Sequence, residues 1–317
     1  VMPDGKIRAR GVAMAMQGSS ISNCDVGSVT VKLSDEGTYH ITVGCTDMGT
    51  GCDTIIAQFA ADVLETPIDN ISVYGVDTDI SPYDSGSYAS STTYLTGMAA
   101  VKACEQLRER IIALAAVRMN KDASALTFDG ENVIDESDGA KMSLFDIATA
   151  SMCNNEISLE VTYSHSSPVS PPPFMAACAE IEADPETGAI ELLDYTACVD
   201  CGTVVNTNLA RVQTEGGLLQ GIGMTLYEDI WYDERGKNLS NSFMQYKVPS
   251  RLDTDRIRVE FDSSYEPTGP FGAKSIGEIV INTPAPAIAD AVYNATGVWI
   301  NELPITPEKI LKGMKVI

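Results

Sequence analysis

The chain has 317 residues, of which 44% are hydrophobic and 21% charged, a composition typical of a soluble globular protein with a sizeable core. Its 44 acidic side chains outnumber the 21 basic ones, and the net charge of -23 repels nucleic-acid phosphates and anionic membrane surfaces, which excludes a nucleic-acid reader. The sequence has no apolar run of about 20 residues and begins without the apolar core of a secretory signal, so we expect a cytoplasmic protein.

The first half of the chain predicts a mixture of strands and helices. Two alternating runs within residues 25–45 predict a β-hairpin. Apolar residues at helical spacing then predict a helix that starts at Asp53 and stops before Pro67, followed by a short strand over 70–76. Residues 90–119 are rich in Ala, Leu and Ile and predict one long helix, whose start carries hydroxyl side chains suited to capping.

A proline-rich segment, residues 164–173, cannot hold regular structure and predicts a boundary between two lobes, 1–165 and 166–317. Strands and helices alternate irregularly on both sides of it, which predicts a mixed α/β (α+β) fold of mixed sheets with packed helices. The expected elements before the boundary are β-fragments around Leu126 and Val133 and a short helix near Ser143. Those after it are strands over 176–184 and 189–200, a helix over 208–221, strands over 224–233 and near Ile257, and a helix over 286–295.

The eight cysteines show no metal-binding framework. Cys198 and Cys201 form one C-x-x-C pair without a second pair, and the chain has only two histidines, which argues against a zinc site. Neither common spacing of an iron–sulfur ligand set occurs. We therefore expect mostly structural, reduced thiols and assign no residue of this chain as a metal ligand.

Glu278 ends the stretch F-G-A-K-S-I-G-E and is a candidate catalytic base. Its neighbours Ile276 and Ile279 favour partial burial, which would raise the pKa of the carboxyl group toward the range useful for proton abstraction. The alternative is an exposed loop carboxylate with Lys274 as a chance partner. From the local sequence alone that alternative is the commoner case.

Three further segments are candidate ligand sites. A glycine-rich loop between a predicted strand and a predicted helix could accept an anionic group at its backbone N–H groups, although such glycines more often serve backbone geometry. A second cluster of small and hydroxyl residues opens the long helix, where ordinary N-capping is the alternative. Two glutamines seven residues apart share one face of a third segment, and solvent exposure is their alternative. The residues are Met48, Gly49, Thr50 and Gly51; Ala89, Ser90, Ser91 and Thr92; and Gln213 and Gln220.

These motifs together resemble, in the same order, the molybdenum-binding portion of the xanthine oxidase family of molybdenum hydroxylases. The resemblance covers nearly the whole chain but only the C-terminal half of a usual molybdenum subunit. It rests on T-D-M-G-T-G-C-D-T, G-V-D-T-D-I-S-P-Y-D-S-G-S-Y-A-S-S-T, V-D-C-G-T-V-V-N, Q-T-E-G-G-L-L-Q-G-I-G, G-A-K-S-I-G-E and A-I-A-D-A-V-Y-N-A-T-G. Collinearity of six motifs is far more specific than any one of them.

The resemblance implies roles for individual residues. Glu278 matches the family's catalytic glutamate, which activates the hydroxyl or water that attacks an electron-poor carbon. Residues 48–51, residues 89–92 and the two glutamines match segments around the pterin dinucleotide, as do Lys274 and Gly277 beside the glutamate. Thr50 stands where the usual family loop has Gln.

The resemblance also implies a multi-subunit enzyme. A split molybdenum subunit looks most like the medium molybdopterin subunit of the nicotinate dehydrogenases of anaerobic bacteria. That reading implies molybdopterin cytosine dinucleotide with molybdenum and a selenium ligand. It further implies a large molybdopterin subunit, an iron–sulfur subunit with [2Fe-2S] clusters and an FAD subunit as partners, with nicotinate hydroxylated at ring carbon 6 and electrons passed to NADP.

Other functions stay open at this point. Within the family, a purine or aldehyde hydroxylase is the alternative, because most substrate-pocket residues are expected on a partner; Tyr83 and Tyr88 are the local candidates to approach a substrate. From other classes, the alternatives are a pterin-binding scaffold without turnover and a subunit that only buries apolar helices against a larger chain.

Overall fold

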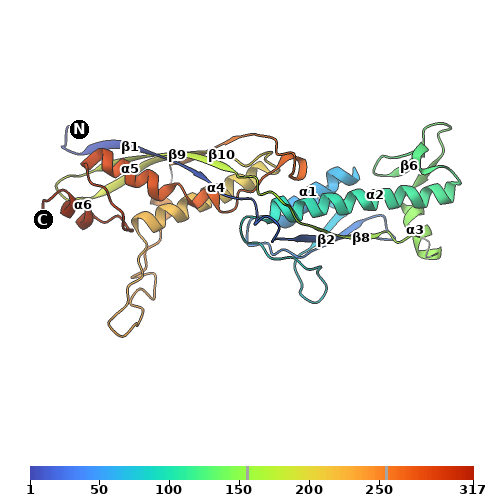
Figure 1. Ribbon diagram of the computed structural model, residues 1–317, viewed down its shortest axis with the longest axis horizontal. Coiled ribbons are helices and arrows are strands. Elements are labelled where there is room, and N and C mark those ends of the chain that lie inside the picture. Colours follow the sequence, from blue (N-terminus) through green and yellow to red (C-terminus); the bar gives the residue numbers. More distant parts are fainter. Residues whose placement is uncertain (155–156, 254–255) are drawn as a thin grey trace. The chain divides into compact units, whose positions relative to one another are not determined.

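The computed structural model describes residues 1–154, 157–253 and 256–317, and the chain divides into two compact units (Figure 1). Unit 1 consists of Val1–Gln17, Pro172–Ser264 and Ile276–Ile317, and unit 2 of Gly18–Pro171 and Tyr265–Ser275. Both units are discontinuous in sequence, unlike the continuous lobes 1–165 and 166–317 that the proline-rich segment predicts. The chain changes unit at residues 171–172, inside that segment.

Unit 2 is built on a four-stranded sheet of order β4-β3-β2-β8. The predicted hairpin is present as β2 (Gly27–Leu33) and β3 (Tyr39–Val43), which pair antiparallel. β4 (Ile71–Tyr74) runs parallel to β3, and β8 (Glu160–His165), which the sequence analysis does not predict, pairs with β2. The helices α1 (Cys52–Leu64) and α2 (Gly97–Met119) pack together on this sheet (Figure 1).

The period-2 alternation of the strands decides which face of this sheet is covered. Val29, Val31, Ile41 and Val43 are fully buried in one apolar core with the helices. The residues between them point to the opposite face, where Thr30 and Thr162 share a hydrogen bond across β2 and β8.

A smaller sheet, β5-β6-β7, and one more helix complete unit 2. Here Lys121, just beyond α2, pairs with the buried carboxylate of Asp135 at 2.8 Å. The elements are β5 (Leu126–Phe128), β6 (Asn132–Asp135), β7 (Lys141–Ser143) and α3 (Leu144–Asn154).

Unit 1 is built on a four-stranded sheet of order β1-β9-β10-β11 with helices packed on one face. The buried residues alternate along β9, and α5 lies against β1 and β9 (Figure 1). A Cβ atom on Gly11 would lie 2.1 Å from the backbone nitrogen of Ala291, so only glycine allows this approach of strand and helix. The elements are β1 (Ile7–Met16), β9 (Phe174–Ala183), β10 (Ile190–Asp200), β11 (Ile257–Asp262), α4 (Thr207–Leu226), α5 (Pro284–Thr296) and α6 (Pro307–Gly313).

The mixed α/β fold of sheets with packed helices is confirmed, but several boundaries differ from those predicted. The long helix over 90–119 begins with a π-helical turn, Thr92–Thr96, and becomes α-helical only at Gly97. The strand predicted over 224–233 is wrong: α4 continues to Leu226, and the following residues form an arm with one isolated bridge between Tyr232 and Asn238 (Figure 1). Within the described ranges, no helix is long and apolar enough to cross a membrane.

Candidate active site and cofactor-binding residues

Glu278 lies at the start of a single 3-10 turn, Ile279–Ile281, in unit 1. Ile279 and Val280 are buried, whereas the Glu278 side chain is exposed. The expected partial burial of Glu278 is therefore wrong: its apolar neighbours point into the core and the carboxylate points outward. A specific contact, and not desolvation, defines its surroundings.

That contact comes from Gln17, at the end of β1. Gln17 Nε2 donates to Glu278 Oε2 at 2.5 Å, and Gln17 Oε1 accepts from Asn282 Nδ2 at 3.0 Å. Glu278 and Asn282 flank the turn four residues apart, so one glutamine amide bridges both sides of it.

Helix α4 holds the backbone of the same turn. Gln213 Nε2 donates to the carbonyl oxygen of Gly277 at 2.8 Å, which fixes the residue immediately before Glu278. At Gly217, one helical turn further, an added Cβ would lie 2.2 Å from Val280 Cγ2, so the helix and the turn are in close contact. Gln220 is exposed, and its role as a cofactor contact stays a prediction.

The predicted loop residues Met48, Gly49, Thr50 and Gly51 lie in unit 2, before α1. Gly49 and Gly51 have φ of 99° and 77°, and their N–H groups donate to Asp47 Oδ1 at 2.9 and 3.1 Å. These two amides are therefore bonded within the loop. Binding of an anionic group at this loop stays a prediction.

Asp47, Cys52 and Asp53 bring one ligand atom each within 4.8 Å of one another. The hydrogen bond of the Cys52 thiol with Cys45, together with burial, raises the pKa of Cys52. Partial burial and the charge of Asp47 raise the pKa of Asp53. A metal ion bound at this group would have to displace the proton of the Cys52 thiol.

The second predicted cluster adjoins the first. Ser87 Oγ donates to the carbonyl oxygen of Thr46 at 2.8 Å and thereby joins the two loops. Ala89 and Ser90 both have left-handed backbone, with φ of 51° and 55°, a conformation that costs about 1–2 kcal/mol for each non-glycine residue. Such strain concentrates at functional sites. The capping alternative is not seen for Ser91, whose hydroxyl instead donates to the Gly86 carbonyl oxygen at 3.2 Å, and Thr92 opens the π turn.

A serine cluster next to these strained residues includes an unsatisfied hydroxyl. Ser20 donates its backbone N–H to the carbonyl oxygen of Ala89 at 2.9 Å, while its buried Oγ has no hydrogen-bond partner among the described residues. Ser19 Oγ bonds to Ser275 Oγ at 2.9 Å, and Lys274 beside it is buried. An orphaned hydroxyl is a feature that a polar ligand would complete.

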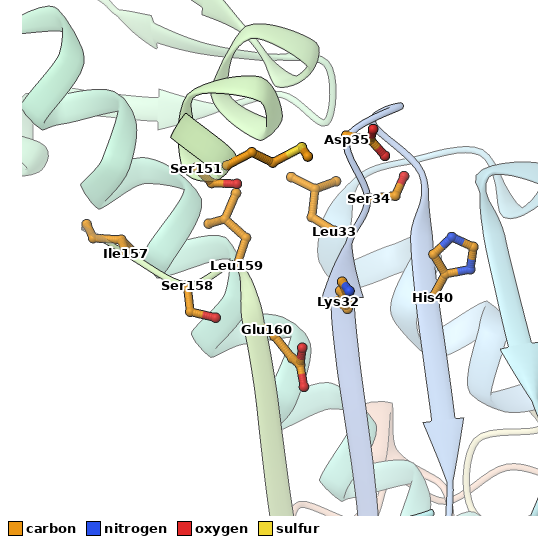
Figure 2. Close-up of a pocket in the computed structure, with 11 residues that line it drawn as sticks. Lys32, Leu33, Ser34, Asp35, His40, Ser151, Ile157, Ser158, Leu159 and Glu160 are labelled. Atoms are coloured by element: carbon orange, nitrogen blue, oxygen red, sulfur yellow. The ribbon is translucent and has the colours of Figure 1, made fainter. Parts of the chain in front are cut away.

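A cavity of about 590 Å³ lies elsewhere in unit 2, beside the turn of the β2–β3 hairpin (Figure 2). Lys32 and His40 line it from the hairpin strands, and Leu159 and Glu160 line it at the start of β8. None of the predicted site residues is among the residues that line this cavity.

Sequence reasoning thus identified Glu278 and Gln213, which the structure brings together, and missed Gln17, Asn282 and Ser20. Unit 2 brings residues 48–51 close to residues 89–92 through Ser87. Asn282 could have been noticed four residues after Glu278, across the apolar run I-V-I. Gln17 carries no local signal, because it is 261 residues distant from Glu278 in sequence.

Comparisons with known proteins identify the family of this chain. A family model described as the molybdopterin cofactor-binding domain matches residues 2–255. The probable hypoxanthine oxidase of Escherichia coli is 38% identical over 310 residues, which cover 97% of this chain and 32% of that protein. The 6-hydroxypseudooxynicotine dehydrogenase complex subunit gamma of Paenarthrobacter nicotinovorans is 31% identical, over 97% of this chain and 40% of the relative.

Solved structures agree in fold. Quinoline 2-oxidoreductase from Pseudomonas putida 86 has a TM-score of 0.89 at 26% identity, over 98% of this chain and 42% of that one. A copper- and molybdenum-containing CO dehydrogenase has a TM-score of 0.87 at 26% identity, over 98% of this chain and 41% of that one. The chain therefore spans less than half the length of each of these proteins.

Proposed function

The chain belongs to the family of molybdopterin cofactor-binding domains, as its resemblance to molybdenum-binding subunits of the xanthine oxidase family predicted, and we propose that it carries the catalytic base of a hydroxylase. The observation that supports this role best is the Glu278 carboxylate, exposed at a turn that Gln17 and α4 hold in place. A carboxylate that is both accessible and positioned is what proton abstraction requires.

In this proposal Glu278 accepts the proton released as water-derived oxygen is transferred to an electron-poor ring carbon. Gln213 fixes the backbone at Gly277, so that the carboxylate starts from a defined place. When bound, the molybdenum cofactor supplies the two-electron oxidation that hydroxylation of the ring needs.

The chain's own residues fit the cofactor in two respects. The unpartnered Ser20 hydroxyl beside Ala89 offers a hydrogen bond to a polar group, and buried Lys274 supplies positive charge for an anionic one. From the motif resemblance we further propose cofactor contacts in each unit taken by itself. In unit 2 they are Met48, Gly49, Thr50, Gly51, Ala89, Ser90, Ser91, Thr92 and Lys274. In unit 1 they are Gln213, Gln220 and Gly277.

For the substrate we propose nicotinate, hydroxylated at ring carbon 6, with molybdopterin cytosine dinucleotide, a selenium ligand on the metal and NADP as electron acceptor. Support comes from the motif resemblance and from relatives named for nitrogen heteroaromatic compounds such as quinoline. A purine is the second candidate, favoured by the 38% identity to the probable hypoxanthine oxidase. Aldehyde hydroxylation and a pterin-binding scaffold without turnover are further alternatives.

An apolar surface supports assembly with larger partners. Val12, Met14 and Met16 on β1 are 66%, 82% and 69% exposed and alternate on the same face of the sheet, where Phe174 pairs with Met16. Adjacent exposed methionines and aromatic residues are characteristic of protein interfaces. We assign this face to contacts with a large molybdopterin subunit, and we place the [2Fe-2S] clusters and FAD on further partner chains.

The test is turnover by the complex isolated from its native host. Nicotinate, hypoxanthine and an aldehyde are each offered with an artificial electron acceptor, and the product is identified by mass. Glu278→Gln is expected to abolish turnover with unchanged molybdenum content, whereas Glu308→Gln, at an exposed position of α6, keeps it. Full turnover by the Glu278→Gln complex would exclude Glu278 as the base.

A further inference from the structure

Gln17 occupies a position that the fold fixes independently of Glu278. It directly follows β1, whose last residue Met16 pairs with Phe174, and its own backbone N–H donates to the carbonyl oxygen of Pro173 at 3.4 Å. The side chain is only half-buried, so its orientation is set by hydrogen bonds and not by core packing.

The two hydrogen bonds of the Gln17 amide determine which end faces Glu278. An ionised carboxylate only accepts hydrogen bonds, so the amide nitrogen must face Glu278 Oε2, at 2.5 Å. The amide oxygen then faces Asn282, whose Nδ2 donates to it at 3.0 Å. A reversed amide would place its oxygen against the carboxylate, so Asn282 and Glu278 favour the same orientation.

Two further contacts fix the backbone on either side of Glu278. Gln213 bonds the carbonyl group of Gly277, and Val280 is buried against Gly217 of α4. An exposed glutamate on a fixed backbone still samples several side-chain rotamers. The Gln17 hydrogen bond is charge-assisted and selects among those rotamers.

We propose that Gln17 is a positioning residue that holds the carboxylate of Glu278 in its reactive orientation, with Asn282 orienting the Gln17 amide. This inference rests on the proposed role of Glu278 as base. Gln17 itself performs no chemical step; it reduces the number of orientations from which Glu278 can accept a proton.

The inference is tested by kinetics on the isolated complex with two variants. Gln17→Met keeps the length of the side chain and removes the donor, and Gln17→Glu keeps the shape and places a second carboxylate against Glu278. With nicotinate, or with hypoxanthine if only the purine is turned over, we expect kcat to fall roughly 10- to 100-fold, since small misplacements of a reacting group have effects of this order. KM should change by less than about threefold, because a group that acts only on the reacting carboxylate leaves substrate binding intact.

A double variant distinguishes a positioning role of Gln17 from a merely structural one. Gln17→Met is combined with Glu278→Gln, and the rate at which substrate reduces the complex is measured in single turnover. If Gln17 acts through Glu278, the double variant is no slower than Glu278→Gln alone. An equal additional loss in that background overturns the inference. Asn294→Ala serves as the matched control, since Asn294 is an exposed asparagine that donates to the Arg10 carbonyl oxygen on the same strand; it should keep wild-type kcat.

The possible failures are distinguishable. Inactive Glu278→Gln together with wild-type kcat in the Gln17 variants overturns the positioning role and leaves the base assignment standing. Full turnover by Glu278→Gln overturns both. If neither Gln17 variant assembles with normal molybdenum content, Asn282→Ala at its exposed position decides: a kcat-specific loss supports the inference, and wild-type kcat overturns it.

Discussion

Gly217 is the position where a single methyl group should disturb catalysis without touching a reacting residue. An ideal Cβ at Gly217 would lie 2.2 Å from Cγ2 and 3.0 Å from Cβ of Val280, which is buried two residues after Glu278. Normal contact between carbon atoms requires about 3.5 Å, so Cγ2 must retreat by about 1.3 Å in Gly217→Ala. Val280 is β-branched and stiff about χ1, so the movement passes to the turn.

The expected magnitudes separate stability from activity. Replacing a helical glycine by alanine stabilises a helix by about 0.5–1 kcal/mol, whereas overpacking of a buried site costs about 1–3 kcal/mol. Gly217→Ala should therefore be destabilised by up to about 2 kcal/mol. A shift of about 1 Å at the carboxylate can lower turnover by about 100-fold. We thus expect a larger effect on kcat than on stability.

The adjacent Gly216 offers a matched control. A Cβ there would meet no atom within 4 Å, so Gly216→Ala should gain only the helical stabilisation. Denaturant unfolding of each chain and turnover of each complex measure the two effects. Equal kcat for the two variants, or greater stability of Gly217→Ala than of Gly216→Ala, would refute the argument that α4 sets the place of Glu278.

Two further predictions concern unit 2. The hydrogen bond from Lys121 lowers the pKa of Asp135 to about 2, below the unfolded value of about 3.9. The stabilisation of the folded chain by this pair is therefore complete above about pH 4 and is lost as the pH falls through about 2. Lys121→Met should lower Tm near neutral pH, and a Tm difference between wild type and variant that does not shrink on acidification would contradict this. Ser20→Ala removes a buried hydroxyl that has no partner among the described residues, so denaturant unfolding should show a chain that is equally stable or up to about 1 kcal/mol more stable. The complex that contains this variant should retain less molybdopterin on dialysis. Unchanged retention would show that Ser20 does not contact the cofactor.

Periodicity predicted most elements of this fold and failed where a residue had two plausible roles. Gly221 and Gly223 predict the end of a helix, yet α4 continues through both of them. A Cβ at Gly221 would lie 2.6 Å from Pro284 and one at Gly223 2.2 Å from Glu228, which explains why glycines stand at these positions. They serve close packing and not termination. The apolar run over 224–233 predicts a strand, but its first three residues belong to α4, and Ile230, Trp231 and Tyr232 beyond the helix are largely exposed.

Strand β1 was not predicted because it is apolar on both faces over much of its length. The inward residues, such as Gly11 and Ala13, pack toward α5, while Val12, Met14 and Met16 remain exposed on the other face. Apolar residues on the exposed face of a strand break the alternation of apolar and polar residues by which half-buried strands are recognised. The exposed apolar residues of β1 therefore explain why the strand was not predicted, and the same residues form the proposed interface.

The residues around Glu278 show how far a motif can define a site. The stretch ending in G-E located the carboxylate. The groups described above that position it are Gln17 directly after β1, Gln213 on α4 and Asn282 after the turn, and these residues belong to unit 1. The Ser20 and Lys274 features that suit a cofactor belong to unit 2. Variants of Gln17 and Gly217 should therefore change kcat at constant molybdenum content, whereas variants of Ser20 should change the content first. Because these readouts are independent, the role of Ser20 in cofactor binding and the role of Gln17 in base catalysis can be tested separately.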